Sequence, residues 1–332
     1  MSALVKNSLI SLIQQIDGGL GRVHARLRGE RPALLTFLFH GLFRDRSEIE
    51  QNLIDPQQEF TLEDFRQFVD YFLTAGYQFV SPDDIVGGLD PDQRYVMATF
   101  DDGYFNNTRA LPILTEYAVP ALFFISTTYV KEGKCFWWDV LYRERLKMGV
   151  PFDRIKEERQ DLAPRKHSEI ESLLIREFGG GALKPVGDID RPMTPSELRD
   201  FSRSEHVALG NHTRDHVYLP NCGAEELRTQ IGGAQQDLLD MTGRSASIIS
   251  YPSGFWSDES IRISREVGIR MGVTVQFRKN YLPVDLDSQA AMELGRFIPT
   301  SNDRLARQYR AFRSDLSLYC GLKSRVSRSD KR

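Results

Sequence analysis

The sequence contains few cysteines, no long apolar run and no excess of positive charge. Its three cysteines, Cys135, Cys222 and Cys320, are widely separated among 332 residues, so they form neither a disulfide framework nor a zinc knuckle. The formal net charge of -3 argues against the basic field that is typical of nucleic-acid-binding proteins, and no nucleic-acid partner is expected. No stretch of apolar residues is long enough to predict a transmembrane helix. With 41% hydrophobic residues, the chain can form one large domain or two ordinary ones. Its cysteines are expected to be reduced thiols.

The first thirty residues also lack the layout of a secretory signal peptide. The apolar run at 9–13 is followed by polar Gln14 and Gln15, and no small-residue cleavage site follows. We therefore expect a cytoplasmic protein in which residues 1–30 form a helix that packs on the remaining chain. The alternative is peripheral contact of this helix and the basic segment 301–332 with the inner face of a membrane. For 301–332, a solvated tail is the simpler interpretation.

Apolar strand patterns alternate with amphipathic helix patterns along most of the chain. Strands are predicted at 33–40, 77–80, 95–100, 121–126, 206–210, 247–251, 271–275 and 293–298. Helices are predicted at 61–76, 82–88, 106–117, 195–204, 224–241 and 257–267. Pro112 should bend or shorten the helix in which it lies. Strands that are apolar throughout and alternate with helices predict a parallel sheet covered by helices, and about seven such units favour a closed barrel.

The alternation stops between about 131 and 192, which we interpret as a helical insert in a domain spanning 31–300. The insert begins near the aromatic residues Phe136, Trp137 and Trp138. These side chains could form a platform for a sugar ring, because aromatic faces suit the apolar face of a pyranose. The simpler interpretation is that they anchor the insert to the barrel.

One predicted strand, 95–100, ends on two adjacent carboxylates, Asp101 and Asp102. Two touching carboxylates cannot both be ionised at low cost in a buried place unless a cation is present or one of them binds a proton. The pair therefore points to a site for a cation or a proton. The structural alternative is that the two residues cap the helix predicted from Asn106.

Two histidines, His212 and His216, follow another predicted strand and are four residues apart. Both imidazoles can face the same point at this spacing, although two surface histidines would give the same pattern. Together with Asp102 they would supply two nitrogens and one carboxylate oxygen, a ligand set that suits zinc or a similar divalent ion in a catalytic site. A Pro-Ser-Gly turn after a later strand could present the Ser253 N–H as an oxyanion donor, or it could simply end that strand.

With these motifs combined, the sequence resembles the polysaccharide deacetylase family, carbohydrate esterase family four. The resemblance covers residues 34–298 and rests on the segments "FHGL", "TFDDGY", "PILTEYAVPALFFI", "NHTRDH" and "SYPSG". It implies a distorted (β/α)7 barrel and a divalent metal ion, with zinc expected and cobalt, manganese or nickel as alternatives. It also implies roles: Asp101 as general base, Asp102, His212 and His216 as metal ligands, and the Ser253 N–H as an oxyanion donor.

Two features that many members of this family share are missing here. No arginine precedes the "SYPSG" motif, and no histidine follows His216 to act as a late general acid. The leaving amine still needs a proton, and we expect His40, at the end of the first strand, or a protonated Asp101 to supply it. The alternative for His40 is a hydrogen-bonded residue that shapes the barrel mouth. Arg296 could pair with Asp101 in place of the missing arginine.

The expected function is hydrolytic removal of an N-acetyl or other N-acyl group from a sugar. The substrate would be an intermediate of surface-glycan biosynthesis that is linked to a nucleotide or a lipid. Removal of a formyl group, of an O-acetyl ester or of an acyl group from a non-sugar amine are alternatives within the same chemistry. The alternative from another class is a non-catalytic carbohydrate-binding protein built on the same barrel.

Overall fold

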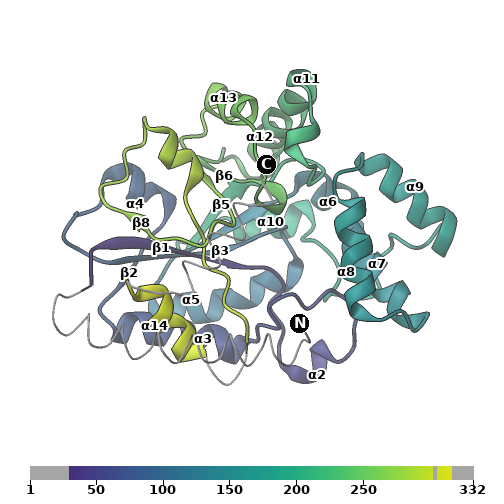
Figure 1. Ribbon diagram of the computed structural model, residues 1–332, viewed down its shortest axis with the longest axis horizontal. Helices are drawn as coiled ribbons and strands as arrows, with labels where there is room; N and C mark the ends of the chain where they lie inside the picture. Colours follow the sequence, from purple (N-terminus) through teal and green to yellow (C-terminus); the bar gives the residue numbers. More distant parts are fainter. Residues whose placement is uncertain (1–29, 302–304, 316–332) are drawn as a thin grey trace.

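The computed structural model describes residues 30–301 and 305–315, so the helix predicted for 1–30 lies outside the described residues except for its last position (Figure 1). The strands are β1 (Ala33–Phe39), β2 (Gln78–Phe79), β3 (Tyr95–Phe100), β4 (Ala121–Ile125), β5 (Val207–Asn211), β6 (Ile248–Ser250), β7 (Met271–Val273) and β8 (Asn280–Tyr281). The α-helices are α2 (Arg46–Ile49), α3 (Leu62–Thr74), α4 (Pro82–Gly87), α5 (Leu111–Tyr117), α6 (Thr127–Glu132), α7 (Trp137–Lys147), α8 (Phe152–Leu162), α9 (His167–Phe178), α10 (Pro195–Phe201), α11 (Ala224–Leu227), α12 (Gly233–Thr242), α13 (Asp258–Glu266) and α14 (Leu305–Arg313).

The strands form one curled sheet that the chain closes into a barrel. Six parallel strands follow the order β7-β6-β5-β4-β3-β1, while β2 pairs with the beginning of β3 and β8 runs antiparallel to β1. The predicted strand at 293–298 is reduced to two bridges, in which Leu294 pairs with Val273 of β7 and Phe297 pairs with Phe37 of β1. These bridges join the two ends of the parallel sheet. The predicted distorted (β/α)7 barrel is thereby confirmed.

The alternation of side chains along β3 places the end of this strand in the barrel mouth. Tyr95 and Met97 belong to the apolar cluster inside the barrel, whereas Val96 and Phe100 belong to the cluster between the sheet and the helices. Because successive strand residues point to opposite faces, Asp101 continues the inward series. It does so at the carboxyl end of a parallel strand, where barrels of this kind carry their functional groups.

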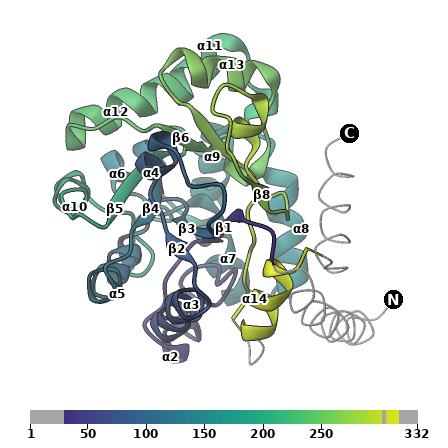
Figure 2. The ribbon, with the colours of Figure 1, turned by 90° about the vertical axis from the view of Figure 1, so that its left-hand side faces the viewer.

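Helix α14 corrects the prediction of a solvated tail for part of the segment 301–332. Figures 1 and 2 both show α14 beside α3 on the outside of the barrel. Leu305, Tyr309 and Phe312 are buried in the main apolar cluster, and Arg313 makes an ion pair of 2.6 Å with Glu30. The tail prediction is therefore wrong for residues 305–313, whose apolar side chains recur on one face of a helix.

Two predicted helices differ from the structure near special residues. The segment from Phe105 to Ala110 forms a 3-10 turn, and α5 begins at Leu111, so Pro112 lies in the first turn of the helix. A proline is well tolerated there because its missing N–H would have no partner within the helix. The helix is therefore shortened at its start and not bent, so the shortening that was one of the two predicted effects of Pro112 is confirmed. The helix predicted at 224–241 consists of α11 and α12 joined by a π-helical turn, Arg228–Gly232.

Helices α7, α8 and α9 lie in the predicted insert and pack at one side of the barrel, at the right in Figure 1. Their apolar side chains share a cluster with Phe43 and Tyr104 from outside the insert, and this cluster includes Phe136, Trp137 and Trp138 with exposed fractions of 0%, 4% and 5%. This burial favours the interpretation that the three aromatic residues anchor the insert. In the described part of the chain, no helix is both long and apolar enough to cross a membrane.

Candidate metal-binding site at the barrel mouth

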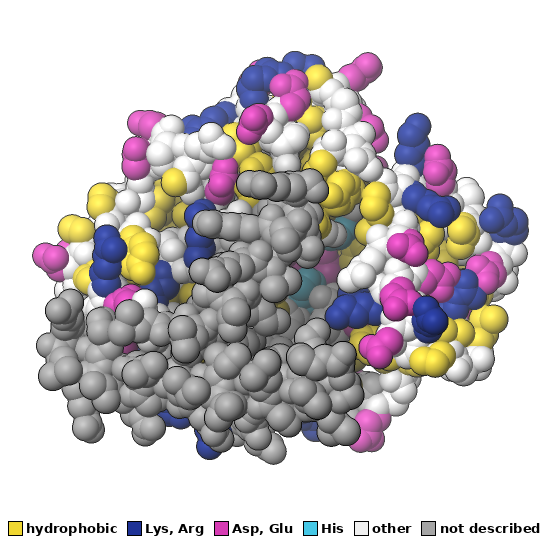
Figure 3. Space-filling view, viewed as in Figure 1, with side chains coloured by type: hydrophobic (Ala, Val, Ile, Leu, Met, Phe, Trp, Pro, Cys, Tyr) yellow, Lys and Arg dark blue, Asp and Glu magenta, His cyan; other side chains and the backbone are white. Residues whose placement is uncertain are grey.

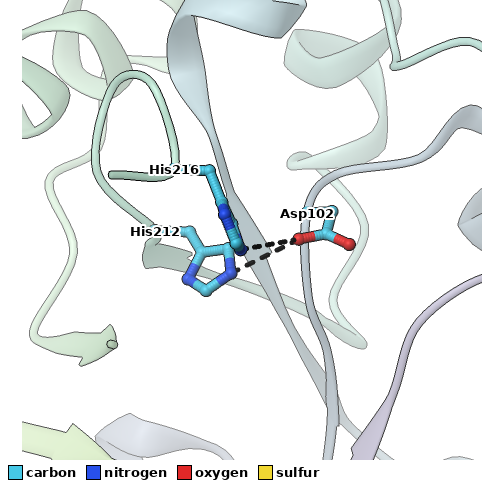
Figure 4. Close-up of side chains that lie close together, drawn as sticks. All are labelled: Asp102, His212 and His216. Atoms are coloured by element: carbon cyan, nitrogen blue, oxygen red, sulfur yellow. Dashed lines mark ion pairs between the residues drawn. The ribbon is translucent and has the colours of Figure 1, made fainter. Parts of the chain in front are cut away.

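Asp102, His212 and His216 come together at the carboxyl ends of β3 and β5 (Figure 4). The Oδ1 atom of Asp102 lies 3.4 Å from His212 Nε2 and 3.6 Å from His216 Nε2. This Oδ1 atom is buried and has no hydrogen-bond partner among the described residues. Two ligand atoms on a tetrahedral zinc ion are about 3.3 Å apart. The spacing and the unpartnered buried oxygen therefore fit a divalent cation.

The backbone at this site adopts conformations that residues other than glycine rarely adopt. Asp102, Thr213, His216 and Ser253 have φ angles of 80°, 62°, 52° and 56°, which lie in the left-handed region. Each such residue costs roughly 1–3 kcal/mol unless the surrounding structure holds it in place. Strain of this kind concentrates at functional sites, and here it falls on two of the three candidate metal ligands.

The tautomer of His212 follows from its hydrogen bond to the backbone. His212 Nδ1 lies 2.7 Å from the carbonyl oxygen of Ser250, and a carbonyl oxygen can only accept. Nδ1 therefore carries a proton, and in the neutral ring the Nε2 lone pair faces Asp102. Burial lowers the pKa of His212, but the neighbouring carboxylates of Asp101 and Asp102 outweigh burial and raise this pKa above its ordinary value. Burial and the charge of a protonated His212 lower the pKa of His216 to about 3, so His216 is neutral. Neutral imidazoles are the form that binds metal ions.

His216 is held by the insert through an aromatic contact. The Trp138 ring lies 4.5 Å from the His216 ring, measured between centroids. Trp138 Nε1 donates to the Tyr104 hydroxyl at 3.0 Å, and this hydroxyl donates to Asp139 at 2.6 Å. A buried hydrogen-bonded chain thus fixes the indole that packs on His216. No spacing in the sequence predicts this chain, although Tyr104 is the last residue of "TFDDGY".

Asp101 pairs with Arg296, as the sequence suggested. Arg296 donates to the two carboxylate oxygens at 2.7 and 2.9 Å, and its other N–H groups bond Thr99, Ser250 and the Thr274 carbonyl. These bonds occupy all of the donors of the guanidinium group. Burial raises the pKa of Asp101, but the charges of Arg296 and His212 and the hydrogen bonds from Arg296 together outweigh burial and hold this pKa well below its usual range. Asp101 is therefore ionised, and its Oδ2 lies 3.8 Å from His212 Nε2.

His40 and Ser253 also face the site. The side-chain amide of Gln58 donates to the Leu38 carbonyl at 3.1 Å, so its oxygen is free to accept from His40 Nδ1 at 3.0 Å. This arrangement leaves His40 Nε2 without a proton in the neutral ring. Ser253 is exposed in the turn after β6, and its N–H makes no hydrogen bond to another described residue. The sequence did not predict the part played by Gln58.

These residues line one cavity of about 680 Å³ between the barrel mouth and the insert. Figure 3 shows histidine side chains at the bottom of the hollow that separates the insert from the barrel. All six candidate site residues of the sequence analysis contribute to its wall: His40, Asp101, Asp102, His212, His216 and Ser253.

The fold and this site define the class of protein as a (β/α) barrel with an Asp-His-His set and a second carboxylate at the carboxyl ends of its strands. Comparison with known families then gives the family. The family model "Polysaccharide deacetylase" matches residues 88–272, which is more than half of the chain. The chain belongs to the polysaccharide deacetylase family.

Individual relatives are distant. YxkH of Bacillus subtilis (strain 168), which is named as a polysaccharide deacetylase, is 21% identical over 258 residues, which are 76% of this chain and 68% of that protein. Among solved structures, the deacetylase PplD of Streptococcus pyogenes in complex with acetate has a TM-score of 0.55 at 17% identity, covering 84% of this chain and 97% of that one. IcaB from Ammonifex degensii has a TM-score of 0.56 at 18% identity, covering 86% and 98%. These similarities establish the barrel fold.

Proposed function

We propose that this protein is a metal-dependent hydrolase that removes an N-acyl group, in the first place acetyl, from a sugar. The observation that carries the proposal is the Asp-His-His set with an unpartnered buried oxygen, placed beside a second, ionised carboxylate. A family of polysaccharide deacetylases supports an acylated carbohydrate as substrate. Asp102, His212 and His216 would hold the ion, with zinc proposed first. A divalent ion at this point would activate a water molecule and polarise the acyl carbonyl.

The remaining site residues supply proton transfer and charge stabilisation in this proposal. Asp101 accepts the proton of the attacking water, because Arg296 keeps its carboxylate ionised. The Ser253 N–H donates a hydrogen bond to the oxyanion that develops on the acyl group. With Nδ1 donating to Gln58, a second proton on His40 is held at Nε2, and the imidazolium ring donates this proton to the leaving amine. We also propose that the substrate is a glycan intermediate met in the cytoplasm or at the inner face of a membrane.

A His40→Ala variant is expected to lower kcat by about a hundredfold, because the leaving amine loses its proton donor. Metal content should not change, since His40 does not belong to the Asp-His-His set. The measurement is acyl release against pH, with Gln58→Ala as a matched variant that keeps the imidazole but removes its partner. Substrates with a better leaving group should be affected less. Full turnover by His40→Ala would remove His40 from the mechanism.

The proposal is tested by metal analysis together with release of acetate and formate from acylated amino sugars that are free, nucleotide-linked or lipid-linked. We expect stoichiometric metal and acyl release in the wild type, and loss of both in His212→Ala. An ester substrate that is hydrolysed faster than the amides would identify an O-acetyl esterase. Stoichiometric metal without release from any substrate would favour a carbohydrate-binding protein. A folded protein that binds no divalent metal would refute the proposal.

A further inference from the structure

The insert supplies one wall of the cleft that contains the candidate metal site. This wall consists of residues from α7, from α8 and from the turn after α8, namely Trp137, Trp138, Arg159, Gln160, Ala163 and Pro164. Trp137 and Trp138 are nearly buried, and Ala163 and Pro164 carry no polar side-chain atoms. Polar recognition from this wall therefore depends on Arg159 and Gln160.

One nitrogen atom of the Arg159 guanidinium group makes a hydrogen bond within the protein, and the other two nitrogen atoms make none to a described residue. Its Nη1 atom bonds the carboxylate of Asp55, whose side chain is only 6% exposed. Asp55 is itself held, because its own N–H donates to Asp139 at 2.9 Å and its carboxylate accepts from the Gln57 N–H at 3.1 Å. The Nε and Nη2 atoms of Arg159 have no acceptor among the described residues. The guanidinium group is thus oriented while most of its donors stay available.

Arg159 is also the positively charged residue of the cleft whose hydrogen-bond donors remain available. Among the described residues that line the cavity, the arginines are Arg159 and Arg296. All N–H donors of Arg296 are bonded inside the barrel. Arg159, with a side chain that is 29% exposed, can therefore bind an incoming acceptor without breaking a bond. The side-chain amides of Gln57 and Gln160 also line the cavity, and neither has a partner among the described residues.

We propose that Arg159, assisted by Gln57 and Gln160, forms a subsite for an anionic oxygen group, a phosphate or a carboxylate, on the acylated sugar. The planar guanidinium group binds such groups through two parallel N–H bonds, which an uncharged sugar hydroxyl cannot use equally well. This inference rests on the proposed function and narrows its substrate to an N-acylated sugar that carries a negative charge. Arg159 and Gln160 lie on the insert and Gln57 lies between α2 and α3, so the insert takes part in substrate choice.

The test compares N-acetylglucosamine with N-acetylglucosamine 1-phosphate, UDP-N-acetylglucosamine and N-acetylmuramic acid. Arg159→Gln should raise KM for the anionic compounds by about tenfold to a hundredfold and leave kcat and the neutral sugar unchanged, because the contact is the same in the ground and transition states. Arg154→Gln is the matched control, since it removes the same charge from α8 at a side chain that is 74% exposed and paired with Glu157. Arg159→Lys keeps the positive charge beside Asp55 but lacks the two parallel N–H donors of the guanidinium group, so it should give an intermediate KM.

Binding of the same compounds by calorimetry separates this inference from the proposed function. If the protein hydrolyses none of them but Arg159→Gln alone binds the anionic ones more weakly, the subsite stands and the hydrolase proposal fails. Weakening confined to the phosphate compounds or to the carboxylate identifies the anion. Equal KM and equal affinity of Arg159→Gln and Arg154→Gln for every anionic compound, with unchanged thermal stability, would overturn the subsite.

Discussion

Replacement of Asp101 by asparagine is expected to lower kcat by about a thousandfold while the protein keeps its metal ion. Asparagine has the shape of aspartate, but its amide cannot accept the proton of the attacking water. Asp101 lies outside the Asp-His-His set, although its Oδ2 atom is 3.8 Å from His212 Nε2. Loss of turnover should therefore be separable from loss of metal. Single-turnover acyl release and metal analysis of the same preparation measure the two effects.

Asp102→Asn is the matched control for this prediction. It makes the same change at the adjacent residue, but it replaces the carboxylate that faces both histidines by a neutral amide, so metal and turnover should be lost together. Arg296 loses its partner in Asp101→Asn, and the folded fraction must be checked by circular dichroism. An Asp101→Asn variant that is folded, metal-loaded and nearly as fast as the wild type would show that another group is the base.

The candidate site was predictable where its chemistry lies in short motifs. Asp101 and Asp102 end a strand, and His212 and His216 have the spacing of a ligand pair, so the sequence brings them to the same edge of the sheet. The contacts that hold these residues in place were harder to predict from the sequence. The pairing of Arg296 with Asp101 joins residues 195 positions apart and could only be suggested from a missing family arginine. The contacts of Gln58, Tyr104 and Asp139 depend on side-chain packing that no periodicity encodes.

The fold was predictable where strands are apolar throughout, and less so where the pattern is mixed. The limits predicted for β3, 95–100, agree with the structure because both of its faces are buried. The last strand is reduced to two bridges because the backbone between them bonds other partners: the Gly295 N–H donates to the Asn280 side chain and the Arg296 N–H donates to the Gln276 carbonyl. Helix α14 was missed because its arginines outweigh three well-spaced apolar residues in any composition-based interpretation.

Replacement of Arg296 by glutamine is expected to destabilise the protein by about 3–5 kcal/mol, because it leaves the buried carboxylate of Asp101 without its counter-charge. Arg296 is 1% exposed and bonds both oxygens of Asp101. Arg296→Lys keeps a charge but cannot form the same set of bonds, so it should recover only part of the loss. The double variant Asp101→Asn/Arg296→Gln removes both charges and should be more stable than Arg296→Gln alone. Urea unfolding of the four proteins at neutral pH measures these differences.

The Arg296→Gln variant should also change the pH dependence of both stability and turnover. In the wild type, Arg296 holds the pKa of Asp101 below its unfolded value of about 3.9, so this stabilisation is complete above that pKa and is lost as the pH falls. In Arg296→Gln, burial acts without Arg296 and raises the pKa of Asp101, so protonation at low pH relieves the buried charge. The stability difference between the two proteins should therefore shrink toward acid pH. For turnover, the acid limb of kcat/KM should move to higher pH, because the base must be ionised. An acid limb that does not move in Arg296→Gln would mean that Asp101 is not the group that limits turnover at low pH.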